Sequence, residues 1–128
     1  MNEFSYRSGQ MFAEDVPLAE LASRYGTPLY VYSRTHLQSQ FRALKAAMAP
    51  VNPLICYAVK ANTNAAVIQT FAAEGAGADV VSAGELYRAR KAGVPSDKIV
   101  FAGVGKTEAE IEYALRENIL YFTVESVP

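Results

Sequence analysis

The sequence is poor in two residue types on which many functional sites depend. It contains one histidine, His36, and one cysteine, Cys56. A catalytic triad or a histidine-based metal centre has too few ligands here, so we expect His36 to lie on the surface and no metal to be bound. Cys56 cannot form an intrachain disulfide, and its apolar neighbours indicate a small buried residue in a reducing compartment.

A charge excess and a long hydrophobic run are also absent. The 12 lysines and arginines nearly balance the 13 acidic residues, for a net charge of −1, and both signs are scattered along the chain. This pattern excludes the electrostatic footprint of a nucleic-acid-binding protein. No apolar stretch approaches the ~20 residues that cross a bilayer. The first residues lack the basic and apolar regions of a signal peptide, so we expect no membrane partner and a cytoplasmic location.

Short apolar runs alternate with helix-length amphipathic runs along most of the chain. The composition, 51% hydrophobic and 20% charged, is that of one globular core. A long helix is predicted from a cap at Ser33 or Thr35 to about Met48. Beyond it, strands are predicted at 54–59, 78–82, 99–102 and 119–124, with helices at about 64–74, 85–92 and 107–117. This alternation predicts an α/β fold with a parallel sheet, either doubly wound or part of a (β/α)₈ barrel.

The first part of the chain is less regular. Residues 4–12 are expected to form an extended segment, and residues 18–25 a short helix that Gly26 ends. The run 28–32, Pro-Leu-Tyr-Val-Tyr, predicts a strand.

Lys60 is the most unusual polar residue at a predicted strand end, because it directly follows the apolar run 54–59. In both α/β folds, functional groups gather at the carboxyl ends of parallel strands. An ammonium group among apolar residues loses hydration, which favours the neutral amine needed for Schiff-base formation. Lys60 is therefore a candidate for that chemistry. The alternative is a lysine that extends along apolar surface and keeps its charge in water.

Asp79 and Glu85 are further candidates, each with a structural alternative. If the strand at 78–82 lies beside the strand at 54–59, Asp79 faces the same way as Lys60. Its carboxylate could then hold charge or position a proton donor, or it could bind a turn backbone instead. Glu85 opens a predicted helix, where the helix dipole favours negative charge.

The glycine-rich segment 103–107, Gly-Val-Gly-Lys-Thr, only superficially suggests a phosphate loop. The motif G-x-x-x-x-G-K-[ST] requires glycine at position 100, which is Val100. The pair Gly75 and Gly77 precedes a predicted strand instead of following one, so a dinucleotide fingerprint is disfavoured too.

Several motifs together resemble those of the decarboxylases that use pyridoxal 5′-phosphate (PLP) and are built on the alanine-racemase-like barrel. The spacing of 19 positions from Lys60 to Asp79 is similar to the family's. Within that group, Ala61 and the segment 103–107 resemble the diaminopimelate decarboxylases more than the ornithine or arginine decarboxylases. The matching stretches, which span nearly the whole chain, are 26–32, 57–62, 77–86, 99–107 and 122–126.

The resemblance implies a fold and a reaction. Residues 34–128 would form the first half of a PLP-binding (β/α)₈ barrel, about the first four βα units. Residues 1–33 would contribute to the family's second β domain. The implied reaction is the decarboxylation of meso-diaminopimelate to L-lysine, with an amino acid as substrate and a homodimer as the assembly.

The resemblance also implies roles for single residues. Lys60 would bond covalently to PLP, and Asp79 would lie near the cofactor. Ala58 would line the floor of the site, and Glu85 would support it.

Family members are several times longer than this chain, which supplies about four of eight barrel strands. The later histidine that stacks on the cofactor ring, the glycine-rich phosphate loop, the acidic residue facing the ring nitrogen and the partner-subunit cysteine motif are missing. We therefore expect an N-terminal fragment that is inactive alone. Two alternatives stay open, namely another PLP-binding protein of the same fold group and a non-catalytic half-barrel module that assembles with itself or another chain.

Overall fold

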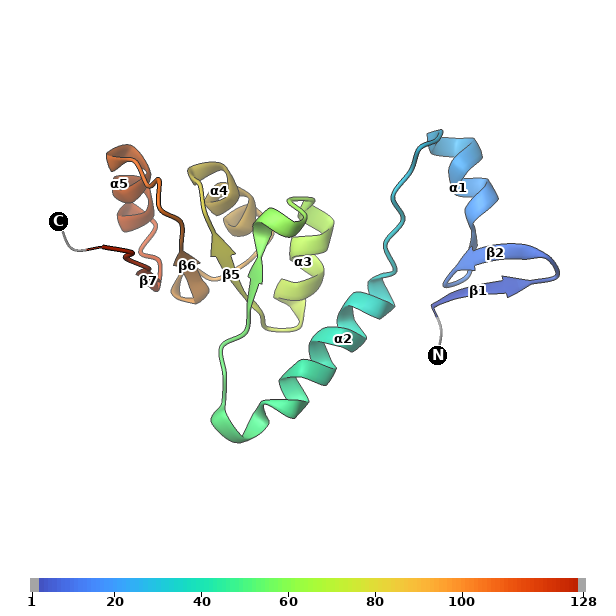
Figure 1. The fold of residues 1–128 in the computed structure, drawn as a ribbon, viewed down its shortest axis with the longest axis horizontal. Helices are drawn as coiled ribbons and strands as arrows, with labels where there is room; N and C mark the ends of the chain where they lie inside the picture. Colours follow the sequence, from blue (N-terminus) through green and yellow to red (C-terminus); the bar gives the residue numbers. More distant parts are fainter. Residues whose placement is uncertain (1–2, 127–128) are drawn as a thin grey trace.

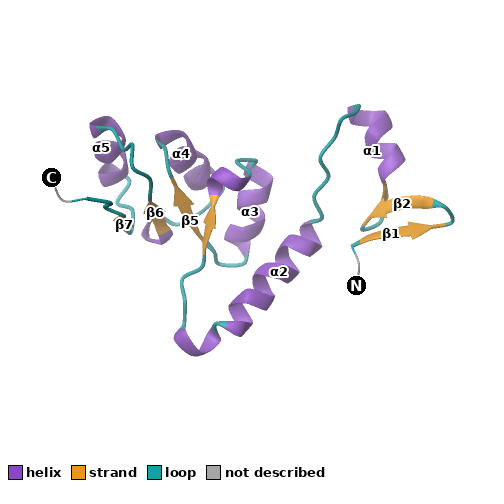
Figure 2. Ribbon diagram, in the orientation of Figure 1, coloured by secondary structure: helices purple, strands orange, loops and turns teal. Residues whose placement is uncertain are grey.

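The computed structural model describes residues 3–126. The outermost residues of the predicted segments 1–33 and 34–128, namely 1–2 and 127–128, lie outside the described residues. Figure 1 shows a small N-terminal sheet at one end of the molecule and a larger sheet at the other, joined by an extended segment and helix α2 (Arg34–Ala47). Figure 2 shows the same arrangement by secondary structure. Within the described range, no helix is both long and apolar enough to span a bilayer.

The N-terminal sheet is a small antiparallel meander. Its strands are β1 (Phe4–Arg7), β2 (Gln10–Ala13) and β3 (Val16–Pro17). The extended segment predicted at 4–12 is therefore a hairpin. Its two turn residues, Ser8 and Gly9, both have positive φ, 49° and 79°, as a two-residue type I′ turn requires.

Helix α1 (Leu18–Tyr25) ends at Gly26 as predicted, but the strand predicted at 28–32 is wrong. Within the described residues this segment has no strand partner, and Tyr30 is 88% exposed. A run of β-favouring residues forms a strand only where a neighbour completes the hydrogen-bond ladder. The segment instead runs as an extended connection to α2.

Two carboxylates, those of Glu14 and Glu3, tie the start of α2 to the N-terminal sheet, and the Glu3 carboxylate lies 3.2 Å from His36 Nδ1. Ser33 caps the helix by accepting a hydrogen bond from the His36 backbone nitrogen at 2.9 Å. Glu14 accepts from Ser33 Oγ at 2.7 Å and from the Thr35 nitrogen at 2.8 Å. These bonds hold the pKa of Glu14 below its usual value. His36 is half-exposed, as predicted for a surface residue.

The larger sheet has four parallel strands in sequential order. They are β4 (Cys56–Ala58), β5 (Gly77–Val80), β6 (Ile99–Phe101) and β7 (Tyr121–Phe122). The connecting helices are α3 (Ala65–Ala73), α4 (Ala83–Lys91) and α5 (Glu108–Arg116). A doubly wound sheet reverses its strand order at a switch point, whereas this sheet does not. The architecture is that of the first units of a (β/α)₈ barrel, with β4 and β7 as the two edges within the described residues.

The helices cover one face of the parallel sheet. Alternate strand residues point to that face, and they form the core together with one or two residues from each helix. The buried cluster includes Ala78, Val80, Ile99, Phe101, Ile68, Leu86, Ala89 and Ala114. The intervening strand residues, Ala58, Asp79 and Val100, are in register with one another and so lie on the opposite face.

Helix α2 is attached to α3 through the residue that ends α3. Arg42 donates to both oxygens of the Glu74 carboxylate, at 2.7 and 2.6 Å. Gln38 donates to the same carboxylate at 2.8 Å. Because the Arg42 guanidinium stabilises the charged form, the pKa of Glu74 is lowered.

Candidate functional site

Lys60 lies in a short 3₁₀ turn, η2 (Val59–Ala61), that directly follows β4. Val59 is fully buried and anchors this turn in the core. The turn places Lys60 at the carboxyl edge of the sheet, as predicted. Lys60 itself is exposed, so the apolar surroundings expected around its ammonium group are absent from this part of the chain. The backbone leaves the strand after Ala58, one residue earlier than predicted.

Asp79 lies on the strand next to the one that leads to Lys60. It is opposite Ala58 in the register of β4 and β5, and both side chains lie on the face away from the helices. One oxygen of the Asp79 carboxylate, Oδ1, is buried and has no hydrogen-bond partner within residues 3–126. A buried carboxylate oxygen without a donor is costly, and native proteins leave few such atoms unexplained.

Cys56 shares this face with Asp79. It is a free thiol that is only half-buried, whereas the sequence predicted a buried residue. Burial raises the pKa of the Cys56 thiol, and the nearby Asp79 charge raises it further. Gly77 stands opposite Cys56, and a side chain there would clash with the Lys98 carbonyl oxygen and approach Cys56 Sγ to 2.8 Å.

Glu85 binds the backbone that connects β5 to α4. Its carboxylate accepts a hydrogen bond from the Val81 nitrogen at 2.9 Å. Its own backbone nitrogen donates to Ser82 Oγ, the helix cap, at 3.2 Å. Glu85 therefore holds the carboxyl end of β5 in place. Among the described residues, no ion pair links Lys60 to Glu85 or Asp79.

The segment 103–107 performs a structural task that sequence reasoning did not find. Lys106 donates to the carbonyl oxygens of Gly103 at 2.5 Å and Thr123 at 2.7 Å, and it lies 3.4 Å from Glu125. Its side chain is only 11% exposed. Lys106 therefore joins the loops that follow β6 and β7, at the same sheet edge as Lys60. No sequence motif could reveal this role, because the carbonyl oxygens that Lys106 binds come together only in the folded chain.

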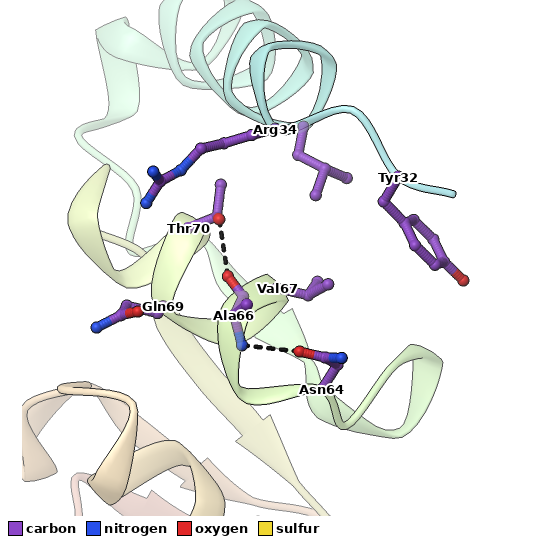
Figure 3. Close-up of a pocket in the computed structure, with 8 residues that line it drawn as sticks. Tyr32, Arg34, Asn64, Ala66, Val67, Gln69 and Thr70 are labelled. Carbon is purple, nitrogen blue, oxygen red and sulfur yellow. Dashed lines mark hydrogen bonds between the residues drawn. The ribbon is translucent and has the colours of Figure 1, made fainter. Parts of the chain in front are cut away.

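A groove lies near this edge but does not contain Lys60. Figure 3 shows it between the start of α2 and α3, with the Asn64 side chain capping α3 and the Thr70 hydroxyl bonded to the Ala66 carbonyl. Its volume is about 520 Å³. A smaller hollow of about 260 Å³ is lined by Ala58 and its neighbours beside α2. Lys60 lines neither of these two cavities.

Comparison with known proteins identifies the kind of domain to which this geometry corresponds. Residues 34–128 match the family model described as "Pyridoxal-dependent decarboxylase, pyridoxal binding domain". The diaminopimelate decarboxylase of Vibrio cholerae is 53% identical over 100% of the chain. That of Aquifex aeolicus is 53% identical over 94% of it.

Solved structures give the same result for the fold. A crystal structure of diaminopimelate decarboxylase from M. jannaschii in complex with L-lysine has a TM-score of 0.92 and 38% identity, and it covers 98% of the chain. A lysine/ornithine decarboxylase from Vibrio vulnificus in complex with cadaverine has a TM-score of 0.79 and 30% identity over 86% of the chain. The chain spans 31% of the Vibrio cholerae protein and 30% of the M. jannaschii chain.

Proposed function

This chain belongs to the pyridoxal-dependent decarboxylase family, and we propose that it is the part of a diaminopimelate decarboxylase that presents the cofactor-binding lysine, Lys60. One observation carries the proposal. Lys60 follows β4 directly at the carboxyl edge of the parallel sheet, beside the strand that bears Asp79. This edge is where (β/α)₈ barrels place their reacting groups.

The described residues fit a PLP site. The buried Asp79 Oδ1 lacks a hydrogen-bond donor within residues 3–126, and a cofactor carrying a proton or positive charge would supply one. Ala58, opposite Asp79 in the register, leaves space above the sheet because its side chain is a single methyl group. These features support a ligand on the face away from the helices.

The residues of this chain would hold the cofactor and position it. PLP, when bound, supplies the electron sink for the charge that remains after CO₂ leaves. Lys60 would bond to the cofactor through Nζ, and its exposed amine forms no ion pair in the described residues that would have to break first. Asp79 would hold a proton or positive charge at Oδ1. Glu85 would keep the end of β5 in register through its bond to Val81.

The remaining proposals concern the whole protein. Diaminopimelate decarboxylases are among the relatives, so we infer meso-diaminopimelate as the amino-acid substrate and L-lysine and CO₂ as the products, in a homodimer. Residues 1–33 would belong to a second β domain, which agrees with their separate antiparallel sheet. A cytoplasmic location agrees with the free thiol of Cys56.

The experiment that tests the proposal is labelling with PLP. The purified chain is mixed with PLP over a range of concentrations, reduced with borohydride and mapped by mass spectrometry. Saturable labelling confined to Lys60 is expected. Lys60→Arg should abolish it, whereas Lys91→Arg, a matched change on the exposed side of α4, should leave it unchanged. Asp79→Asn should raise the PLP concentration needed for half-maximal labelling.

Weak labelling spread over Lys45, Lys91, Lys98 and Lys106 would contradict a built cofactor site in this chain. A non-catalytic half-barrel module would then be the better description, and the molecular mass in solution would test whether copies associate. A complete protein that carries this chain is expected to release CO₂ from meso-diaminopimelate, and loss of that activity in Lys60→Arg would support the role of the lysine.

A further inference from the structure

We propose that Tyr57 is a positioning residue that holds the loop carrying Lys60, a role that rests on the proposed function of Lys60. Tyr57 lies in β4, before the turn that contains the lysine. Its hydroxyl donates a hydrogen bond to the backbone carbonyl of Asn62 at 3.1 Å. A single side chain thus connects the strand before Lys60 with the backbone beyond it.

The Tyr57 ring is itself held by the core. It stacks on Phe71 of α3, with ring centroids 4.5 Å apart and planes inclined by 21°. Phe71 in turn contacts Phe41 of α2 at a centroid distance of 6.0 Å. Burial raises the pKa of Tyr57, so its hydroxyl keeps its proton and remains a donor. The hydroxyl that binds the loop therefore belongs to a ring that is packed within an aromatic cluster of β4, α3 and α2.

The loop is also held by local hydrogen bonds, and the contribution of Tyr57 can be measured separately from theirs. The Asn62 nitrogen donates to the Val59 carbonyl at 3.1 Å and closes the turn. The Asn64 nitrogen donates to Asn62 Oδ1 at 2.9 Å and leads into the cap of α3. These bonds shape the loop and join it to the start of α3. Arg88 of α4 also donates to a backbone carbonyl of the loop, at 3.4 Å. Tyr57 joins the loop to the sheet and, through the stacked ring, to α3.

The consequence concerns the geometry of Lys60. A lysine side chain is flexible, and any movement of its backbone adds to the movement of its amine. A firmly held backbone therefore restricts the positions that the Lys60 amine can take. Before Lys60, Ala58 is paired with Asp79 in the sheet. After it, Asn62 is held by Tyr57. Reacting groups need supporting residues of this kind, because small misplacements slow reactions strongly.

The first test measures the loop without any cofactor. Tyr57→Phe keeps the ring and its stacking but removes the donor. We expect amide hydrogen exchange at Asn62 and Asn64 to accelerate roughly two- to tenfold, the range that corresponds to the loss of one net hydrogen bond. Amides of β5 and β6 should exchange as before. Tyr113→Phe is the matched control, since Tyr113 is a partly buried tyrosine that packs on the core from α5.

The second test measures labelling of Lys60 by PLP, with reduction and peptide mapping. In Tyr57→Phe, the limiting rate of labelling at Lys60 should fall by a similar factor. The half-saturating PLP concentration should stay unchanged, because binding before bond formation does not use Tyr57. A general loss of structure would instead change both quantities and increase labelling at other lysines such as Lys91.

The outcomes separate this inference from the proposed function. If the unaltered chain shows no saturable labelling at Lys60, the proposed function fails, and hydrogen exchange alone decides whether Tyr57 holds the loop. If Lys60 is labelled but Tyr57→Phe changes neither loop exchange nor the limiting rate, the positioning role of Tyr57 is overturned. Circular dichroism of each variant establishes that the fold is retained.

Discussion

The carboxylate of Glu110 lies 3.0 Å from the backbone nitrogen of Ala83 and accepts its hydrogen bond. Glu110 belongs to α5, whereas Ala83 is the first residue of α4. The same carboxylate accepts from the Thr107 nitrogen at 3.1 Å in the capping box that starts α5. One side chain therefore caps its own helix and fixes it to the start of the preceding helix.

This double role predicts a dependence of stability on pH. The bonds from Ala83 and then Thr107 lower the pKa of Glu110 below the usual 4.5. A carboxyl group whose pKa is lowered in the folded state stabilises the protein at pH values above its unfolded-state pKa. This contribution is lost as the pH falls through the folded-state pKa. Glu110→Gln should therefore lower the unfolding midpoint at pH 7. The difference from the unaltered chain should disappear in acid.

Urea unfolding monitored by circular dichroism at several pH values checks this expectation. Glu112→Gln is the control, because Glu112 is 62% exposed and, within residues 3–126, forms an ion pair with Arg116 alone, at 3.6 Å. Surface pairs of this type contribute little. A pH-independent loss of stability in Glu110→Gln would show that the charge of Glu110 is not what matters.

Gly77 permits close packing between neighbouring strands. A side chain at this position would clash with the Lys98 carbonyl oxygen and lie 2.8 Å from Cys56 Sγ. Gly77→Ala should cost about 1–3 kcal/mol of unfolding free energy, the usual range for overpacking. Gly105→Ala should change it by less than about 0.5 kcal/mol, because apart from the chain neighbours no heavy atom of the described residues lies within 4 Å of the added carbon there.

A double variant identifies the source of the clash at Gly77. Cys56→Ala removes the sulfur but leaves the Lys98 carbonyl, so adding it to Gly77→Ala should restore only part of the stability. Denaturant unfolding of the two single variants and the double variant gives this coupling. Full recovery would mean that the backbone carbonyl moves away freely, contrary to the packing described above.

Lys106 should stabilise the loops that follow β6 and β7. Its ammonium group donates to the carbonyls of Gly103 and Thr123 and is largely buried. Lys106→Met keeps much of the stem but leaves both acceptors without their donor, so we expect a loss of about 1.5–3 kcal/mol in the free energy of unfolding. Thermal or urea unfolding measures it. Lys91→Met, at an exposed position over the Tyr87 ring, should change stability little. Equal losses in both variants would contradict the role of Lys106 in joining the two loops.

Local signals in the sequence were sufficient for the ends of several helices. A helix was predicted to start at about residue 107, and the structure has a complete capping box there, formed by Thr107 and Glu110. Gly26 predicted the end of α1. Such signals are reliable because a cap or a helix end depends on residues only a few positions apart. The motif around Lys60 likewise indicated the family, which the match over residues 34–128 confirms.

Properties that depend on distant partners could not be obtained in this way. The run 28–32 has strand-forming residues, but the described residues supply no neighbouring strand for it. The backbone leaves β4 after Ala58 and Lys60 is exposed, and the apolar run 54–59 specifies neither.

The sequence by itself determined the alternation of strands and helices and the identity of the lysine motif, because periodicity, caps and short motifs are encoded by neighbouring residues. Only the tertiary structure decided that the strands follow one another in sequential order, that Asp79 Oδ1 is buried without a donor in residues 3–126, and that Tyr57 reaches the carbonyl of Asn62. These relationships depend on register and on side chains that meet across elements, and the sequence does not state which residues will meet.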